Sequence, residues 1–298
     1  MPEPLRLLIL GANGRLGRAL TRLYSAGPHQ VASWSRVELD LTDLERIPAV
    51  LAAADFDVLI NAAGLTSVDS CEERREEARL SNGVAPGLLA DFCARHGRRL
   101  IHISSDYVFS GTTPAPLRET DPTGPCNHYG HTKLDGENAV LAADPSALVA
   151  RVSWLFGPDK PSFPDMILRT ALEQDHVSAV NDKWSSPSYS EDLAAWLLAL
   201  IQDHPTASGL FHLCNGGAPS WQQYGQETLD IASRLGLPLK TRTVTGHSML
   251  GFAPFIAARP PHTALDTSKF HALTGIQPRS WQDALSAYIQ SSWSRAIR

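Results

Sequence analysis

Two side chains four positions apart, Tyr129 and Lys133, form the pair in this sequence best suited to move a proton. On a helix they share one face, which brings a phenol beside an ammonium group. A free tyrosine has a pKa of about 10, and a neighbouring positive charge favours the phenolate and brings that pKa toward working pH. General acid–base catalysis needs such a shift. A half-buried tyrosine beside a solvated lysine is the alternative interpretation of the pair alone.

A hydroxyl that could orient a carbonyl group lies upstream at Ser105, where an apolar segment expected to form a strand ends. Open parallel sheets bind their ligands at this carboxyl edge. From there the hydroxyl could hydrogen-bond a substrate carbonyl and hold it for attack. We therefore predict that Ser105, Tyr129 and Lys133 are the catalytic residues.

A glycine-rich turn, Gly11–Gly17, follows the apolar run Leu5–Leu10 and precedes a segment with helical spacing. In this context glycines allow a tight turn and close approach to a pyrophosphate, whose charge the helix N-terminus attracts. The spacing is G-x-x-G-x-x-G rather than G-x-G-x-x-G, and a glycine turn without a ligand is the alternative. Together with the catalytic residues, the turn predicts carbonyl–alcohol redox chemistry on a nicotinamide cofactor. The predicted cofactor contacts of this turn are Gly11, Asn13, Gly14, Arg15, Leu16 and Gly17.

The end of the second expected strand indicates which nicotinamide is bound. An NAD site usually has an acidic residue there, about 20 residues after the glycines. This chain has Ala32–Arg36 at that place, with no carboxylate before Glu38. Ser35 and Arg36 would suit a 2′-phosphate, because a guanidinium pairs bidentately with it. The sequence therefore favours NADPH and leaves NADH and a solvated Arg36 as alternatives.

Apolar strand-like runs alternate with helix-like segments through the first half of the chain. Continuous apolar strands separated by helices predict an α/β fold with a doubly wound parallel sheet covered on both faces. The expected strands are 5–10, 31–34, 57–61, 100–104 and 147–152, and the expected helices are 16–25, a helix ending near residue 54 with a capping box at Thr42 and Glu45, 72–96 with a bend near Pro86, and 127–141.

After Trp154 the alternation loosens, prolines cluster, and helices are expected at 191–201, 221–235 and 281–290. A long stretch, 246–263, has little periodicity and is expected to be a functional loop. We predict a dinucleotide-binding Rossmann domain over residues 1–155. Residues 156–298 would form a mainly substrate-binding region, discontinuous and returning some elements to the sheet.

Composition excludes several classes of function. The 298 residues are 43% hydrophobic and carry a net charge of −5, which is typical of a soluble globular protein and gives no basic surface for nucleic acid. No segment has the length of a membrane span, and the start, Met1–Arg6, lacks the pattern of a signal peptide. Four scattered cysteines predict reduced thiols in the cytoplasm. No metal site is predicted.

These motifs lie in a chain that resembles the extended short-chain dehydrogenase/reductases, and more narrowly the dTDP-4-dehydrorhamnose reductase family of sugar-nucleotide reductases. The Ser-Asp-Tyr-Val-Phe and Arg-x-Ser-Trp stretches are specific to the narrower family. The resemblance covers most of the chain and includes Gly11–Gly17, Asp40–Asp43, Asn61–Gly64, Thr66–Asp69, Ser104–Phe109, Tyr129–Lys133, Gly136–Glu137, Arg151–Trp154, Asp192–Ala194, Arg259–Pro260 and Leu265–Lys269.

The resemblance implies NADPH-dependent reduction of the 4-keto group of a nucleotide-linked 6-deoxysugar, with dTDP-4-dehydro-L-rhamnose as the expected substrate. Tyr129 would donate a proton to the keto oxygen, and Lys133 would tune Tyr129 and bind the nicotinamide ribose. Asp40 and Leu41 would lie against the adenine, and Ala62, Ala63 and Gly64 along the cofactor. The implied substrate contacts are Thr66, Val68, Ser105, Asp106, Tyr107 and Trp154. A homodimer is compatible with the resemblance.

Two of the expected substrate residues have structural alternatives. Trp154 would pack its ring on a sugar, or it is a core tryptophan behind the strand. Arg259 is the best candidate for a contact with the substrate diphosphate, or it is a surface arginine; Arg169 and Lys183 are weaker candidates.

The sequence also departs from the family pattern. Ser105 stands where threonine is usual, and Ser110 stands where an acidic residue is usual. The segment 181–187 only loosely follows the family's Asp-Gln-x-Gly-x-Pro. Two other functions therefore stay open: a non-catalytic dinucleotide-binding regulator resembling the regulatory subunit of methionine adenosyltransferase, and a sugar-nucleotide epimerase or dehydratase.

Overall fold

A six-stranded parallel sheet forms the centre of the computed structural model, which describes residues 4–114, 116–250 and 255–293. The strand order is β10-β5-β4-β3-β1-β2. Its strands are β1 (Arg6–Leu10), β2 (Gln30–Trp34), β3 (Val58–Asn61), β4 (Arg99–Ser105), β5 (Leu148–Val152) and β10 (Gly209–Leu213).

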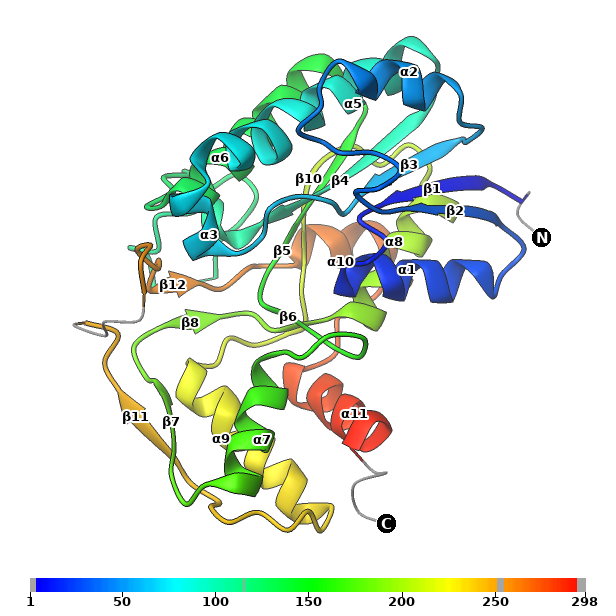
Figure 1. The fold of residues 1–298 in the computed structure, drawn as a ribbon. Helices are drawn as coiled ribbons and strands as arrows, with labels where there is room; N and C mark the ends of the chain where they lie inside the picture. The colour runs from blue at the N-terminus through cyan, green and yellow to red at the C-terminus, as the bar shows by residue number, and fades with distance from the viewer. Residues whose placement is uncertain (1–3, 115, 251–254, 294–298) are drawn as a thin grey trace.

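Helices cover both faces of the sheet (Figure 1). Leu7 and Ile9 of β1 pack with one set of helices, and their neighbours Leu8 and Leu10 pack with the other. Because both faces of the inner strands are buried, their positions favour apolar residues, and the predicted doubly wound fold is confirmed. The first set is α1 (Arg15–Ser25) and α8 (Ser190–Gln202), and the second is α2 (Arg46–Ala52), α5 (Ala85–Arg95) and α6 (His128–Ala143).

Below the sheet, a smaller C-terminal lobe has its own apolar core (Figure 1). It contains α7 (Phe163–Glu173), α9 (Trp221–Arg234) and α11 (Trp281–Trp293) with the parallel pair β7 (Val177–Val180) and β11 (Val244–His247). Helix α7 was not predicted, although Ser162 and Asp165 form its capping box and Pro164 lies in its first turn.

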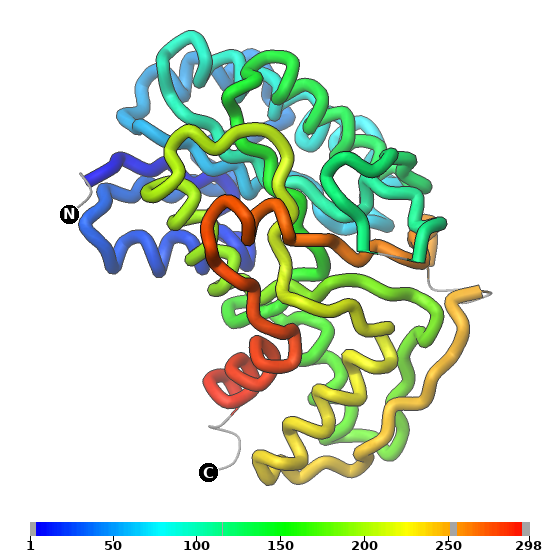
Figure 2. Tube along the Cα trace, turned by 180° about the vertical axis from the view of Figure 1, so that it is seen from behind, coloured from blue at the N-terminus to red at the C-terminus, as the bar shows by residue number. Residues whose placement is uncertain are grey.

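Several elements of the second half connect this lobe to the sheet. Strand β10 pairs with β5, and α8 packs on the sheet. The pair β8 (Trp184–Ser185) and β12 (His262–Thr263) lies between the two lobes, as the orange segment in Figure 2 shows from behind. The remaining elements are β6 (Leu155–Phe156), β9 (Ser188–Tyr189), η2 (Asp106–Val108) and α10 (Ser268–Thr274).

The prediction of one helix over 72–96 is wrong. The chain instead forms α3 (Val68–Glu73), α4 (Arg75–Ala78), a π-helical segment η1 (Arg79–Val84) and α5. Arg74 leaves the helical conformation, with φ −114° and ψ 57°, and Pro86 at the start of α5 cannot donate the hydrogen bond of a regular turn. A wider π turn accommodates this loss, and such turns are frequent at functional sites.

The capping box predicted at Thr42 and Glu45 is also wrong. Helix α2 begins at Arg46 without a side-chain cap, and the Thr42 hydroxyl donates to Asp40 Oδ1 at 2.7 Å. A local side-chain bond of this kind competes with helix formation. The predicted loop 246–263 contains the end of β11 and all of β12; its residues 251–254, and residues 1–3 of the predicted N-terminal segment, lie outside the described residues. Among the described helices none is both long and apolar enough for a membrane span.

Candidate functional site

One cavity of about 750 Å³ runs along the carboxyl edge of the sheet, where β1 to β5 end. From β2 toward β5 it is lined by Ser35, Gly11, Ala62, Ser105 and Trp154, each at or just after a strand end. Apart from Gly17 and the two weaker candidates Arg169 and Lys183, every residue predicted to contact cofactor or substrate lines this cavity. Side chains chosen from separate motifs therefore meet in one site.

The glycine turn has the close packing that its motif requires. Gly11 has φ +83°, and a Cβ there would lie 2.7 Å from the backbone of Ala62. A Cβ on Gly17 would lie 2.2 Å from the Gly11 carbonyl oxygen, so the absence of a side chain at Gly17 lets α1 pack closely on the turn. Arg15 also lines the cavity, and its guanidinium donates to the Leu155 carbonyl at 3.0 Å. The cradle fits a dinucleotide pyrophosphate at the start of α1.

Tyr129 and Lys133 lie on one face of α6, as their spacing predicted, and both side chains are buried. Lys133 Nζ donates to the Ile103 carbonyl oxygen at 2.7 Å, and burial lowers the pKa of this lysine to about 8. Burial also raises the pKa of Tyr129, so the expectation that Lys133 lowers it is wrong for this arrangement. Tyr129 is a neutral phenol at neutral pH, which is the form that gives a proton.

A buried network of hydrogen bonds orients the Ser105 side chain. Its hydroxyl donates to Asp106 Oδ1 at 3.1 Å and accepts from the Tyr107 backbone N–H at 3.2 Å. The other Asp106 oxygen accepts from the Ser153 hydroxyl at 2.7 Å, and burial raises the pKa of Asp106. These bonds fix the Ser105 oxygen at the end of β4.

Helix α6 reaches the cavity because its N-terminus is capped and its glycines allow close packing. The Asn127 side chain accepts from the Gly130 N–H at 2.8 Å and donates to the Ala258 carbonyl at 2.7 Å. A Cβ on Gly130 would lie 2.2 Å from the Tyr107 carbonyl oxygen, and the Tyr107 and Tyr129 rings meet edge to face at 5.6 Å. Helix α6 therefore packs closely against the segment after Ser105 that contains Tyr107.

Trp154 fits both of its sequence interpretations. It lines the cavity, and it belongs to the aromatic cluster of the C-terminal lobe, with ring centroids 5.1 Å from Trp221 and 4.8 Å from Tyr224. Its φ of +41° is rare for a residue with a side chain, and such strain clusters at ligand sites. The core therefore holds this ring at the cavity wall.

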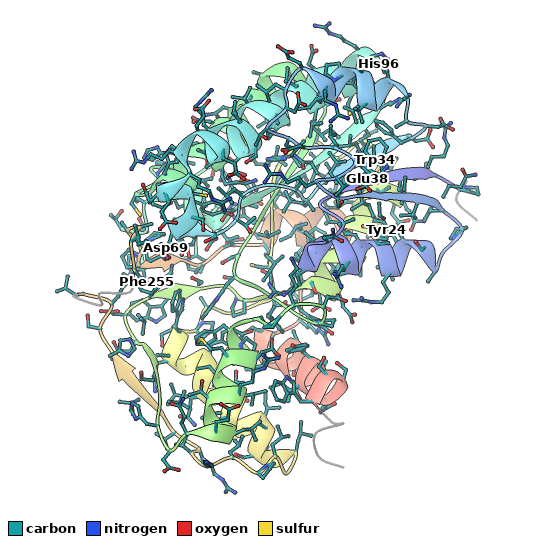
Figure 3. All side chains as sticks on the ribbon, viewed as in Figure 1. Tyr24, Trp34, Glu38, Asp69, His96 and Phe255 are labelled. Carbon is teal, nitrogen blue, oxygen red and sulfur yellow. The ribbon has the colours of Figure 1, made fainter. Side chains whose placement is uncertain are left out.

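Arg259 is not a surface arginine, because its side chain is only 8% exposed. Its guanidinium donates to Asp69 Oδ2 at 2.7 Å and lies 4.8 Å from the Phe255 ring centroid. Figure 3 labels Asp69 and Phe255, which lie close together between the two lobes. The ion pair places Arg259 in the cavity wall where a diphosphate could reach it.

The two weaker arginine and lysine candidates do not line this cavity. Arg169 is exposed on α7. Lys183 is buried, donates to the Pro260 carbonyl at 2.7 Å, and lies 5.1 Å from the Tyr107 ring centroid; burial lowers its pKa to about 8. We infer that Lys183 supports the wall behind Tyr107.

Sequence reasoning missed several residues that line the cavity. The Ser104 hydroxyl is buried and has no hydrogen-bond partner among the described residues, which fits a polar group of a bound cofactor. A serine beside Ser105 was the only sequence signal for it. The charged and aromatic residues that were missed are Arg74, Glu77, Lys160 and Trp221.

Comparisons with known proteins find relatives over nearly the whole chain. Residues 5–293 match the RmlD substrate binding domain family. The chain is 35% identical to dTDP-4-dehydrorhamnose reductase of Streptomyces griseus, over 100% of this chain and 97% of that protein. It is also 35% identical to a probable dTDP-4,6-dihydroxy-2-methyloxan-3-one 4-ketoreductase of Streptomyces antibioticus, over 94% and 93%. The structure of dTDP-4-dehydrorhamnose reductase from Bacillus anthracis in complex with NADP superposes with a TM-score of 0.90 at 28% identity, covering 97% and 100% of the two chains.

Proposed function

The chain belongs to the RmlD substrate binding domain family, and from that membership we propose that it is an NADPH-dependent reductase of dTDP-linked 4-keto sugars. We propose dTDP-4-dehydro-L-rhamnose as its substrate and dTDP-L-rhamnose as its product. One observation carries the proposal: a glycine cradle and the Ser105, Tyr129 and Lys133 side chains line a single cavity.

The residues of the cavity would each have a distinct part in the reduction. When bound, the reduced nicotinamide supplies a hydride to the carbonyl carbon. Tyr129 would give its phenolic proton to the carbonyl oxygen, which suits a tyrosine whose pKa is raised by burial. Ser105 would transfer its hydrogen bond from Asp106 to that oxygen, and the Lys133 ammonium, which lies at the Ile103 carbonyl, would bind the nicotinamide ribose.

The role of Ser105 gives a first prediction. Removing the hydroxyl in Ser105→Ala should lower kcat by roughly 10- to 100-fold, because a hydrogen bond to a developing oxyanion is worth about 1.5–3 kcal/mol. Ser105→Thr keeps the hydroxyl and should retain most of the activity, which makes it the matched control. Steady-state kinetics with a saturating keto-sugar nucleotide measures both. Equal losses in the two variants would contradict a hydroxyl role.

The pKa of Lys133, lowered by burial to about 8, gives a second prediction. The ammonium form is present below this pH and is lost above it, so kcat should fall as the pH rises through about 8. The slope should approach tenfold per pH unit, as for a single required proton. A pH profile of kcat tests this, with Lys183→Gln as control because burial lowers the pKa of Lys183 to the same value. If the fall of kcat above about pH 8 disappeared in Lys183→Gln, the titrating group would be Lys183, and the assignment to Lys133 would be contradicted.

A panel of 4-keto-sugar nucleotides tests the proposed function directly. With NADPH and NADH in parallel, loss of the reduced-nicotinamide absorbance should be fastest with NADPH and dTDP-4-dehydro-L-rhamnose. Binding of the cofactor without turnover on any keto sugar would favour the regulatory protein. A copurified NAD(H) that is not consumed in net terms would favour an epimerase or dehydratase. The homodimer and the cytoplasmic location stay predictions of the sequence.

A further inference from the structure

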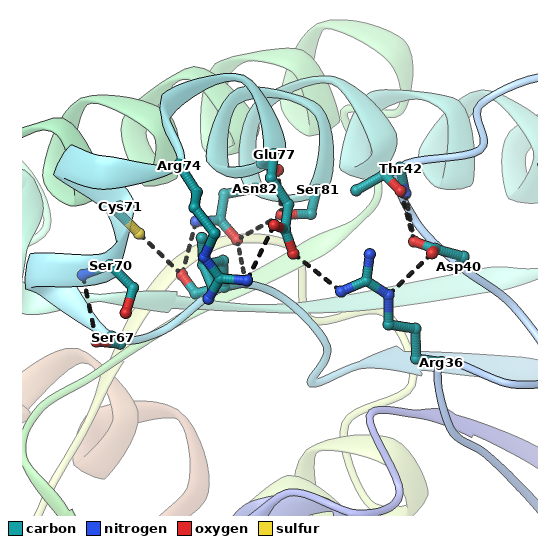
Figure 4. Close-up of polar contacts among 11 residues, drawn as sticks. Arg36, Asp40, Thr42, Ser67, Ser70, Cys71, Arg74, Glu77, Ser81 and Asn82 are labelled. Carbon is teal, nitrogen blue, oxygen red and sulfur yellow. Dashed lines mark hydrogen bonds and ion pairs between the residues drawn. The ribbon is translucent and has the colours of Figure 1, made fainter.

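Four charged side chains form a chain of ion pairs at the β2 end of the cavity (Figure 4). Arg36 donates from Nε to Asp40 Oδ2 at 2.8 Å and from a terminal nitrogen to Glu77 Oε1 at 2.9 Å. Glu77 also accepts from Arg74, through its other oxygen, at 3.0 Å. All four side chains line the cavity. One carboxylate, Glu77, therefore joins two guanidinium groups.

The fold explains how these residues meet. Arg36 follows β2, whose end faces the adenosine ribose in dinucleotide-binding sheets. Arg74 stands at the break between α3 and α4, and Glu77 lies in α4. The break in the helix brings the guanidinium of Arg74 into the ion-pair chain at this end of the cavity. Arg74 is 38 positions away from Arg36 in the sequence. Ser35, which the sequence also suggested for the 2′-phosphate, is not part of the ion-pair chain; its hydroxyl donates to Glu38 at 2.7 Å.

The charge balance of this group sets how strongly it attracts a phosphate. Two guanidinium groups face two carboxylates, Asp40 and Glu77, so the group is formally neutral. Two guanidinium groups bind a phosphate well, whereas a carboxylate beside it repels it. The Glu77 carboxylate occupies the same donors that a phosphate would use.

We propose that Arg74 and Arg36 form a clamp for the 2′-phosphate of NADPH, and that Glu77 weakens this clamp. Glu77 would thus limit how strongly the site prefers NADPH over NADH. This inference rests on the proposed function. It assigns cofactor selectivity to Arg74 and Glu77, which lie outside the glycine turn and the end of β2. Binding of the 2′-phosphate displaces the Glu77 carboxylate from the two arginines. Glu77 thereby keeps the site open to both cofactors.

Calorimetric titration of the full chain with NADP⁺ and NAD⁺ tests the clamp, because the two probes differ only in the 2′-phosphate. Arg74→Gln should weaken NADP⁺ binding by about tenfold, the order expected for one partly exposed charge-assisted contact, and leave NAD⁺ binding unchanged. Glu77→Gln keeps the side-chain shape and should tighten NADP⁺ binding several-fold without affecting NAD⁺.

Neighbouring residues provide matched controls. Arg75 pairs with Glu72 and Glu76 pairs with Arg79, and neither Arg75 nor Glu76 lines the cavity. Arg75→Gln and Glu76→Gln should leave the ratio of the two affinities as in the wild type. An unchanged ratio in both Arg74→Gln and Glu77→Gln overturns this inference alone. Failure of the wild-type chain to bind either dinucleotide overturns the cofactor assignment and the clamp together.

Discussion

Tyr129→Phe should lower kcat by about 10²- to 10⁴-fold, the usual contribution of a general acid. The substitution removes one oxygen and keeps the ring, so the edge-to-face contact with Tyr107 at 5.6 Å is preserved. The variant should therefore fold normally and bind NADP⁺ as the wild type does. Single-turnover measurement of the reduction, with calorimetry for the cofactor, separates the loss of proton transfer from a loss of binding.

A second buried tyrosine serves as the control for this variant. Tyr24 lies on α1 outside the cavity, and its hydroxyl donates to the Ala194 carbonyl at 3.0 Å. Tyr24→Phe should reduce stability by about 1 kcal/mol and leave kcat near the wild-type value. If Tyr129→Phe retained more than a tenth of wild-type kcat, Tyr129 would not be the proton donor, and the assignment of the catalytic residues would fail with it.

The second large effect is expected from Glu137→Gln, which should lower the free energy of unfolding by about 3–5 kcal/mol. Glu137 and Arg151 form a bidentate pair at 2.9 and 2.7 Å, and each side chain is 2% exposed. Losing the carboxylate charge leaves a buried guanidinium without its counter-charge. Thermal unfolding should show a midpoint lower by roughly 10 °C.

This pair also connects the catalytic helix to the sheet. Glu137 lies on α6 one turn after Lys133, and Arg151 on β5 is in register with Ser104 of β4. Some loss of kcat should therefore accompany the loss of stability. In the exposed pair of Glu227 and Arg234, Glu227→Gln should cost less than about 1 kcal/mol. A Glu137→Gln variant as stable as this control would show that the buried pair does not hold α6 in place.

Local spacing was sufficient to predict the glycine turn, five of the six strands of the sheet and many of the residues that line the cavity. Gly11 follows β1, Ser105 ends β4, and Tyr129 lies in the first turn of α6. The period of each of these elements is visible in the sequence, and parallel strands bring their ends to one edge. Gly17 was predicted to contact the cofactor together with the rest of its motif; in the structure it packs against Gly11 and does not line the cavity, and its cofactor contact stays a prediction.

What could not be predicted depends on long-range packing. Arg74 enters the site because the helix expected over 72–96 is broken, and Trp221 enters it because the C-terminal lobe folds back beside Trp154. The pKa of Tyr129 was predicted in the wrong direction, since spacing shows the neighbouring Lys133 but not the burial, nor the Ile103 carbonyl that holds the ammonium. Contacts of this kind appear only when the chain has folded.

The central claim is that this cavity transfers a hydride from a reduced nicotinamide to the keto carbon of a dTDP-linked sugar. The most direct test uses NADPH that carries deuterium at the transferring position, with dTDP-4-dehydro-L-rhamnose as substrate. Mass spectrometry should find one deuterium in the sugar product, attached at C4, for each cofactor oxidised. A product without deuterium, or a substrate that is not reduced while the cofactor stays bound, would contradict the claim.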